Sequence, residues 1–129
     1  MIRRLVSVTA ALALSAAPVL AQPQADPQSA AHEPSYSERL VQLSQVLGGA
    51  HYLRVLCAGL ADQRWRDSMR NVMRHEPRYA MQMVEGFNRG YREEEARFAD
   101  CDDAAQAMEA ELRTQGTRLA GALRARPQQ

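Results

Sequence analysis

The stretch that decides the fold is SYSERLVQLSQVLGGAHYLRVLCA, residues 35–58. It opens with a capping box, because the Ser35 hydroxyl can accept a hydrogen bond from the Glu38 amide while the Glu38 side chain reaches back. Apolar residues then recur at steps of three and four, which is the period of a helix. They are Tyr36, Leu40, Leu43, Leu47, Ala50, Leu53 and Cys57. The pattern predicts one long helix that ends at about Ala58, just before Gly59.

A glycine pair, Gly48-Gly49, lies in the middle of this helix. The apolar period passes through the pair unbroken, so we expect the helix to continue and the glycines to allow close approach of a neighbour. The alternative is a break at this point, since each Gly costs a helix about 1 kcal/mol relative to Ala.

Three further helices are expected downstream. We expect Asp62 to cap a second, shorter helix that ends at Glu76-Pro77, and Pro77 suits the first turn of a third helix. Asp102 or Asp103 would cap the fourth helix, because short acidic side chains accept hydrogen bonds from the free amides of a first turn. The fourth helix should end near residue 124.

An apolar stripe of helical period runs along each of these three helices. The second carries Trp65, Met69, Val72 and Met73; the third carries Ala80, Val84, Phe87, Tyr91 and Phe98; the fourth carries Ala105, Met108, Leu112, Gln115, Leu119 and Ala122. Gly86 and Gly90 lie four residues apart in the third helix, a spacing that suits close helix contact. We expect a shared core that contains Trp65, Phe87, Tyr91 and Leu112. The sequence therefore predicts an all-α fold, a small four-helix up-down bundle with one short helix.

The N-terminus has the three-part pattern of a cleavable export signal. Arg3 and Arg4 precede an apolar run over residues 5–14, and cleavage is expected after about Ala21. An N-terminal membrane anchor is the alternative, but residues 5–20 fall short of the ~20 residues that span a bilayer. The expected organisation is a signal peptide at 1–21, a disordered Pro-, Gln- and Ala-rich leader at 22–34, the helical domain at 35–124 and a disordered tail at 125–129.

Export would place the chain in the periplasm with no transmembrane segment after cleavage, because no other stretch is apolar enough to span. Loss of Arg3 and Arg4 would change the formal net charge from +1 to −1, with fourteen Arg against fifteen acidic residues. A nearly neutral chain has no global electrostatic reason to bind nucleic acid.

The two cysteines, Cys57 and Cys101, are expected to form one disulfide. Cys57 ends the first helix and Cys101 follows the third, and in an up-down bundle the C-terminal ends of these two parallel helices lie at the same level. Such a bond is worth about 4 kcal/mol on the chain-entropy model. Redox catalysis is the alternative, but it usually needs a Cys-x-x-Cys pair, and these cysteines are 44 positions apart.

The residue patterns of catalysis and cofactor binding are missing from the sequence. His32, His51 and His75 have no Cys, Asp or second His at metal-ligand spacing. There is no Gly-x-Ser-x-Gly elbow, no Gly-rich phosphate loop and no Cys-x-x-Cys-His haem motif. The run Asp100-Cys101-Asp102-Asp103 lacks the glycine and the terminal Glu of a calcium loop. We therefore expect no enzymatic activity, no cofactor and no metal.

A basic stripe is formed by Arg66, Arg70 and Arg74, which lie at four-residue steps on one face of the second helix. It could hold an anionic partner, such as lipid headgroups or an acidic protein. The alternative is an ordinary solvated helix face.

Two polar residues, Arg54 and Asn88, fall within apolar stripes by the helical count. A buried guanidinium needs an ion partner and a buried amide needs hydrogen bonds. We expect Arg54 to pair with Glu94 or Glu95 on the third helix. The alternative is a ligand site, and the candidate binding or buried polar residues are Arg54, Trp65, Arg66, Asn88 and Tyr91.

Several short motifs occur in a fixed order along the domain: Leu47–Arg54 followed by Leu56-Cys57, Trp65-Arg66-Asp67 with Met69, Phe87–Arg92, and Cys101. In these motifs the chain resembles an uncharacterised family of small exported proteobacterial proteins, a domain of unknown function with two well-separated cysteines. The resemblance covers residues 36 to about 123. It implies export and a disulfide, and it implies no activity and no catalytic residue.

The sequence thus favours a non-catalytic interaction or structural module in the periplasm, with an unknown protein partner in the cell envelope. The alternative function is a binder of a small ligand or lipid, in a pocket near Arg54, Trp65, Asn88 and Tyr91.

Overall fold

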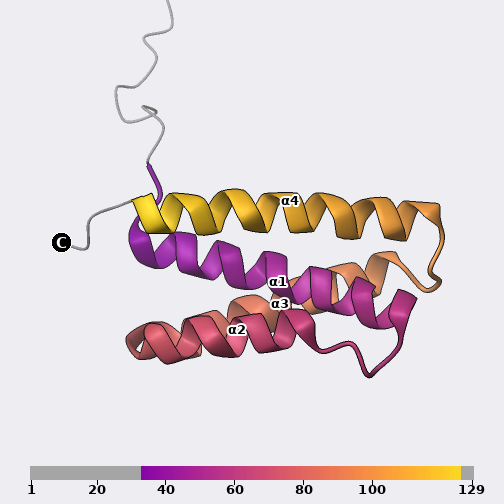
Figure 1. The fold of residues 1–129 in the computed structure, drawn as a ribbon, viewed down its shortest axis with the longest axis horizontal. Coiled ribbons are helices and arrows are strands. Elements are labelled where there is room, and N and C mark those ends of the chain that lie inside the picture. The colour runs from indigo at the N-terminus through magenta and orange to yellow at the C-terminus, as the bar shows by residue number, and fades with distance from the viewer. Residues whose placement is uncertain (1–32, 126–129) are drawn as a thin grey trace, which may run out of the picture. The chain divides into compact units, whose positions relative to one another are not determined.

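The computed structural model describes residues 33–125, which fold into four α-helices and no strand. The expected signal peptide, all but two residues of the expected leader, and residues 126–129 lie outside the described residues. The helices are α1 (Tyr36–Ala58), α2 (Arg64–His75), α3 (Ala80–Arg97) and α4 (Asp103–Ala125), with a short 3-10 helix, η2 (Pro77–Tyr79), before α3. Successive helices run in opposite directions (Figure 1). The predicted all-α fold of four packed helices, with α2 the short one, is confirmed.

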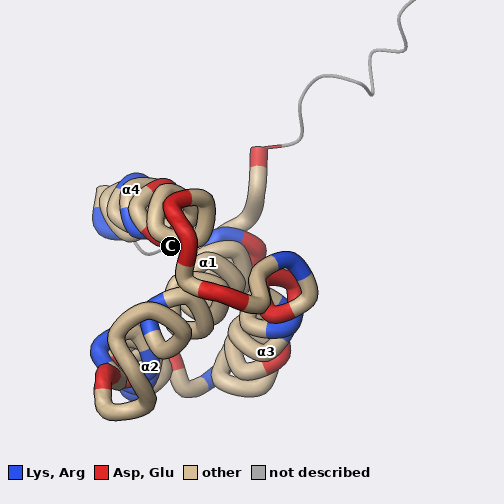
Figure 2. The backbone as a smooth tube through the Cα atoms, turned by 90° about the vertical axis from the view of Figure 1, so that its right-hand side faces the viewer, with Lys and Arg blue, Asp and Glu red and all other residues tan. Residues whose placement is uncertain are grey.

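Helix α1 is the centre of this arrangement. The other three helices all pack against α1, and the view along the bundle shows them around it (Figure 2). A helix that is covered on several sides must be apolar on several sides. Accordingly, α1 buries residues all around its axis: Leu40, Leu43, Ser44, Val46, Leu47, Gly48, Gly49, Ala50, His51 and Leu53.

Both ends of α1 form as the sequence predicts. The Ser35 hydroxyl accepts a hydrogen bond from the Glu38 amide at 3.3 Å, and the Glu38 carboxylate accepts one from the Ser35 amide at 2.6 Å. The helix continues through Gly48-Gly49 without a break and stops at Gly59, whose φ of 95° is a conformation that L side chains rarely adopt. The capping box and the glycine stop therefore fix the length of the central helix.

Glycines set the distance between α1 and α3. A Cβ atom added at Gly48 would lie 1.9 Å from the carbonyl oxygen of Phe87, and one added at Gly90 would lie 1.8 Å from that of Gln45. Backbone thus touches backbone where the two helices meet, so the predicted close approach is confirmed. No residue with a side chain beyond hydrogen fits at these two positions without moving α3 away from α1.

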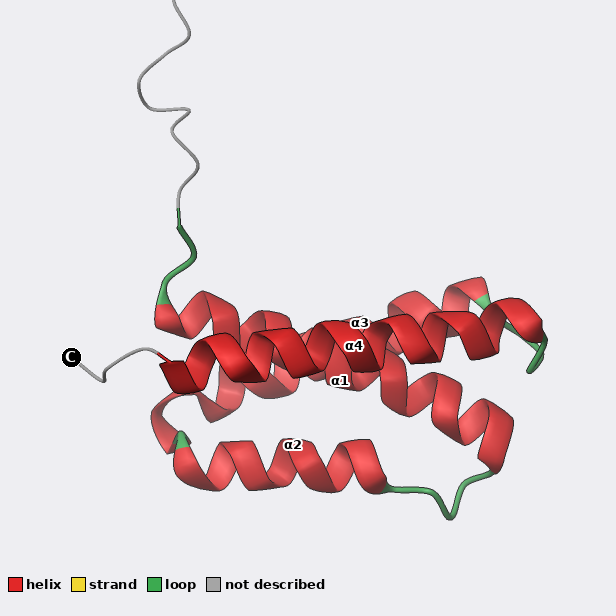
Figure 3. Ribbon diagram, turned by 45° about the horizontal axis from the view of Figure 1, so that its top comes forward, coloured by secondary structure: helices red, strands yellow, loops and turns green. Residues whose placement is uncertain are grey.

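The connections between helices are short, and they appear in green in Figure 3. The prediction that Asp62 caps α2 is confirmed only in part: the N-cap position is Gln63, whose side chain makes no capping hydrogen bond, but Asp62 Oδ1 accepts a hydrogen bond from the Arg64 amide at 3.4 Å. The same carboxylate also binds the guanidinium groups of Arg54 and Arg64. Asp102 does cap α4, since its Oδ1 accepts a hydrogen bond from the Ala105 amide at 2.8 Å.

A hydrogen bond ties the start of α1 to the end of α2. The Tyr36 hydroxyl donates to the carboxylate of Glu76, which follows α2 directly. This bond, with burial, raises the pKa of Tyr36 to about 12. It anchors the C-terminal end of the short helix α2 to the first turn of α1.

The hydrophobic core lies where α1 meets α2 and α3, and it consists of Leu40, Leu43, Leu47, Met69 and Met83. Trp65 and Phe87 are half-buried and pack against this core. The prediction of one core shared by Trp65, Phe87, Tyr91 and Leu112 is therefore confirmed for Trp65 and Phe87 and wrong for Tyr91 and Leu112, which are not among the residues packed against this core. Phe87 and Tyr91 border one groove, whereas Trp65 and Leu112 border another.

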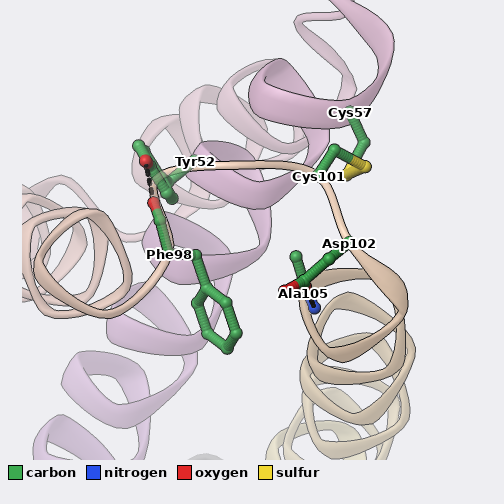
Figure 4. The surroundings of a disulfide bond; sticks show 6 residues. All are labelled: Tyr52, Cys57, Phe98, Cys101, Asp102 and Ala105. Atoms are coloured by element: carbon green, nitrogen blue, oxygen red, sulfur yellow. Dashed lines mark hydrogen bonds between the residues drawn. A yellow bond between two sulfur atoms is a disulfide. The ribbon is translucent and has the colours of Figure 1, made fainter.

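The predicted disulfide is present between Cys57 and Cys101, with their Cα atoms 5.0 Å apart (Figure 4). It joins the end of α1 to the link between α3 and α4. Beside it, the Tyr52 hydroxyl donates to the carbonyl oxygen of Phe98. Two connections therefore hold the end of α3 against α1. None of the helices between residues 33 and 125 is both long and apolar enough to cross a membrane.

Candidate functional site

A groove of about 520 Å³ lies between α2 and α3. These two helices both pack on α1 and hardly touch each other. We call this space the α2–α3 groove. Its lining comes from α1, α2, α3 and the link after α1: His51, Val55, Leu60, Gln63, Arg66, Met69, Arg70, Met73, Val84, Phe87, Asn88 and Tyr91.

Large apolar side chains at the groove are left uncovered. Leu60 on the link after α1 is 80% exposed, and Val84 on the α3 wall is 44% exposed. Met69 lies at the foot of the α2 wall and belongs to the core. The groove is thus an apolar trough that is continuous with the core beneath it.

His51 lines the groove from α1 and is buried, with 6% of its surface exposed. Its ring centroid lies 5.7 Å from that of Phe87 and 6.1 Å from that of Tyr91, so two groove residues flank it. Burial, reinforced by the positive charge of Arg66, lowers the pKa of His51 below its usual value. The imidazole is therefore neutral at neutral pH.

The Nδ1 atom of His51 is buried and has no hydrogen-bond partner among residues 33–125. A buried polar atom without a partner costs about 1–3 kcal/mol. Such a cost is tolerated when a bound molecule or a water supplies the missing partner. His51 is thus the one buried polar side chain of the described groove lining with an unmet hydrogen bond.

The charged side chains among the described lining residues have a single sign, although the nearby carboxylates of Asp62 and Asp67 act on the pKa of His51 in the upward direction. Arg66 and Arg70 line the groove, and no Asp or Glu is among its described lining residues. Arg70 forms an ion pair with Asp67, at 3.0 Å between Nη1 and Oδ1. The Arg66 side chain forms no hydrogen bond or ion pair with any residue between 33 and 125, so its charge is available to a ligand.

Three of the predicted site residues meet in this groove: Arg66, Asn88 and Tyr91. Tyr91 is half-buried, as expected for a residue at the edge of a core. Asn88 is exposed, so the prediction that it is a buried amide is wrong. It lies on the outer part of the α3 wall, because α3 turns its glycine face toward α1.

Arg54 lies elsewhere, and the predicted pairing with Glu94 or Glu95 is wrong. Its Nε lies 2.8 Å from Oδ2 of Asp62, and the two side chains are 30% and 15% exposed. Hydrogen bonds from Arg54 and Arg64 lower the pKa of Asp62 to about 2. The buried Glu94 pairs with Arg97 on its own helix, at 3.1 Å.

The path of the chain after α1 explains why Arg54 pairs with Asp62. The link after α1 folds back past the last turns of the helix, so Asp62 reaches Arg54 from only eight residues away. Glu95 is exposed on α3. Arg54 instead borders a separate groove beside the disulfide, which also includes Glu109.

Trp65 does not line the α2–α3 groove. It lines a smaller groove of about 200 Å³ toward α4, together with Leu112. Its Nε1 atom is buried and has no acceptor within the described part of the chain. The predicted pocket of Arg54, Trp65, Asn88 and Tyr91 is therefore not one pocket, because its four members border three different grooves.

Residues 35–126 match the model of a family described as a protein of unknown function (DUF2385). The chain belongs to this family. DUF2385 thus covers all four helices and both cysteines. No curated protein and no solved structure matches the chain. The family description assigns no activity, so the function of this DUF2385 domain must be argued from its own surface.

The basic stripe of the DUF2385 domain is divided between two environments. Arg66 and Arg70 border the α2–α3 groove, whereas Arg74 donates a hydrogen bond to Asn71 at 3.0 Å and lies outside the groove lining. Arg74 therefore provides a matched comparison for Arg66, with the same residue type on the same helix.

Sequence analysis missed His51 as part of the site of this DUF2385 domain. A signal for it was present, since His51 follows Ala50 and precedes Leu53 inside a helix that is apolar on several sides. A histidine there must be buried or must open onto a cavity, and it does both. Among the described residues, no three His, Cys, Asp or Glu side chains gather as a metal site.

Proposed function

We propose that this DUF2385 protein is an exported, non-catalytic binding module, and that a protein partner docks a short helical segment in the α2–α3 groove. The observation that carries the proposal is the groove itself: two helices that share α1 as their support leave an uncovered apolar trough between them. Helix-in-groove binding uses apolar anchor side chains from one face of an amphipathic helix.

The size and lining of the groove support this kind of occupant. A volume of about 520 Å³ takes the anchor side chains of one segment rather than a whole domain. Methionines at such surfaces adapt to different partners because their side chains are flexible and polarisable. Met69 and Met73 line the α2 wall, and the docked segment would cover the exposed Leu60 and Val84.

The expected location in the periplasm is part of the same proposal. Disulfides form and persist in oxidising compartments, and the Cys57–Cys101 bond fits that environment. The N-terminal pattern of two arginines, an apolar run and a small-residue cleavage site supports export to it. A partner in the cell envelope would meet the groove there.

A small amphiphilic ligand is the second candidate occupant. The unpartnered Nδ1 of the buried His51 favours it, because small-molecule pockets combine apolar walls with a few convergent polar groups. Such a ligand would place its apolar body along Phe87 and its polar group near the imidazole.

Site-specific photo-crosslinking in intact cells tests the proposal. A photoreactive amino acid replaces Asn88 on the groove wall, and the matched control replaces Gln82, which is exposed on α3 and does not line the groove. A discrete protein adduct is expected from position 88 alone. It should disappear when Val84→Asp places a charge in the groove.

Equal adducts from both positions, or none from position 88, would contradict a protein-binding groove. The second candidate is tested on the purified domain by thermal shift with fatty acids and lysolipids. A rise in melting temperature that is abolished by Val84→Asp would then favour the small ligand.

A further inference from the structure

The charges that line the α2–α3 groove indicate which kind of segment it would bind. Of the charged side chains between residues 33 and 125, those that line this groove are the guanidinium groups of Arg66 and Arg70. The groove between α3 and α4, of about 480 Å³, has the opposite character: Glu93 and Glu94 line it and no Arg does. The α2–α3 groove thus has two guanidinium groups and no carboxylate in its described lining, whereas the smaller groove toward α4 has the single Arg113.

Arg66 is the more available of the two guanidinium groups. Arg70 is engaged by Asp67 one turn away, at 3.0 Å. Arg66 has no ion partner among the described residues, and it lies on the rim of an apolar trough. A charge beside a desolvated apolar contact steers and orients a partner more than it adds to the raw affinity.

We infer that the α2–α3 groove selects an acidic amphipathic segment, in which a carboxylate pairs with Arg66 while apolar side chains of the same segment cover His51 and Phe87. This inference rests on the proposed function. Charge complementarity chooses the occupant: a basic segment would bring like charge to Arg66 and meet no carboxylate in the described lining. An acidic segment would form an ion pair with Arg66, and no existing ion pair of Arg66 would have to break.

The geometry also explains why apolar and anionic recognition occur together. His51 and Phe87 lie in tilted ring contact, with 5.7 Å between centroids and 38° between the ring planes, and both line the groove. Arg66 lines the same groove as both rings. A segment seated on the rings therefore has its polar face within reach of Arg66.

Two synthetic peptides serve as probes. Both are 14-residue helices with the same leucine face; one carries Glu and the other Lys at the polar positions. Binding to the mature, disulfide-bonded protein is followed by fluorescence anisotropy, and the binding site is located by amide chemical shifts of the labelled protein. The Glu peptide is expected to bind roughly five-fold more tightly than the Lys peptide, as one exposed ion pair allows.

Substitution of Arg66 tests whether this residue causes the preference for the Glu peptide. Arg66→Gln should remove most of it, and Arg66→Glu should reverse it. Arg74→Gln, on the same helix outside the groove, should leave the preference unchanged. Because Arg66 is exposed, these variants are expected to retain wild-type helix content by circular dichroism.

The outcomes separate the two proposals. If both peptides shift groove resonances equally and Arg66→Gln changes nothing, acidic selection is wrong and helix docking stands. If neither peptide shifts the resonances of groove residues, the docking proposal fails and the inference fails with it. If Arg74→Gln abolishes the preference while Arg66→Gln does not, acidic selection by the groove is overturned.

Discussion

Arg54 shows how a single side chain can be placed on the correct face and given the wrong partner. The helical count correctly indicates that Arg54 is partly covered and ion-paired. The count cannot show the path of the link after α1, which returns Asp62 to within 2.8 Å of the guanidinium. Loop geometry, which leaves no periodic pattern in a sequence, decided the pairing.

The Arg54–Asp62 pair makes a prediction about acid titration. The pKa of Asp62 is lowered to about 2 from 3.8, so its contribution to stability is present above pH 3.8 and is lost as the pH falls toward 2. In Arg54→Gln, the carboxyl resonance of Asp62 should titrate closer to 3.8. Glu95 is the control residue in the same spectra. An unchanged Asp62 titration would contradict the assigned pairing.

His51 makes a second prediction, in the mildly acidic range. Its pKa in the folded state lies below 6.5 because burial disfavours the imidazolium. The unfolded chain then binds the extra proton first, so the free energy of unfolding should be level above pH 6.5 and should fall as the pH decreases below it. Urea unfolding at a series of pH values measures this slope.

The matched variants are His51→Gln and His75→Gln. The first should flatten the slope between about pH 5 and 6.5, where an unperturbed histidine titrates. The second replaces a histidine that is exposed at the end of α2 and should keep the slope. Equal slopes in wild type and His51→Gln would show that burial of the imidazole does not govern the acid response.

At the scale of elements, the apolar stripe of α3 correctly indicates a helix but does not show which face packs against α1. The stripe through Val84, Phe87 and Tyr91 has helical period and was expected to face the core. Instead the face with Gly86 and Gly90 lies against α1, because glycines allow the closest contact of two backbones. The larger apolar residues are then displaced to one side, where they form the wall of a groove.

The helix boundaries, in contrast, were largely predictable. They depend on local chemistry: the Ser35–Glu38 capping box, the stop at Gly59 and the cap by Asp102 are each written in a few adjacent residues. The up-down order follows from short connections. The rotation of each helix about its axis depends on distant contacts, and that rotation is what determines the candidate site.

The close contact between α1 and α3 predicts that Gly→Ala substitutions differ strongly in their effect on the free energy of unfolding. Gly90→Ala or Gly48→Ala should lower the free energy of unfolding by about 3 kcal/mol or more, since the new methyl group collides with a backbone carbonyl. Gly121→Ala is the control, because a Cβ atom there meets nothing within 4 Å. It should be neutral or stabilise the helix by up to about 1 kcal/mol. Chemical denaturation of the three variants measures these values.

At the scale of the whole molecule, a small domain depends on a central helix and one covalent link. Domains of this length bury a limited core, so a disulfide contributes a substantial part of their stability. Replacing both Cys57 and Cys101 by Ser should lower the free energy of unfolding by roughly 2–4 kcal/mol and keep most of the helix content. Circular dichroism during urea unfolding, compared with the reduced wild type, checks this. A loss below about 1 kcal/mol would mean that helix packing alone holds the domain.

The disulfide also divides the chain into a ring and two arms. Residues 57–101 form a closed loop that contains α2 and α3, while α1 and α4 extend from it. A protease that cuts once inside the loop, for example beside the exposed Leu60, opens the ring without releasing a piece. The nicked protein should run as one band on a non-reducing gel and as two after reduction. A domain cleaved in this exposed link would thus remain a single molecule with its groove walls attached.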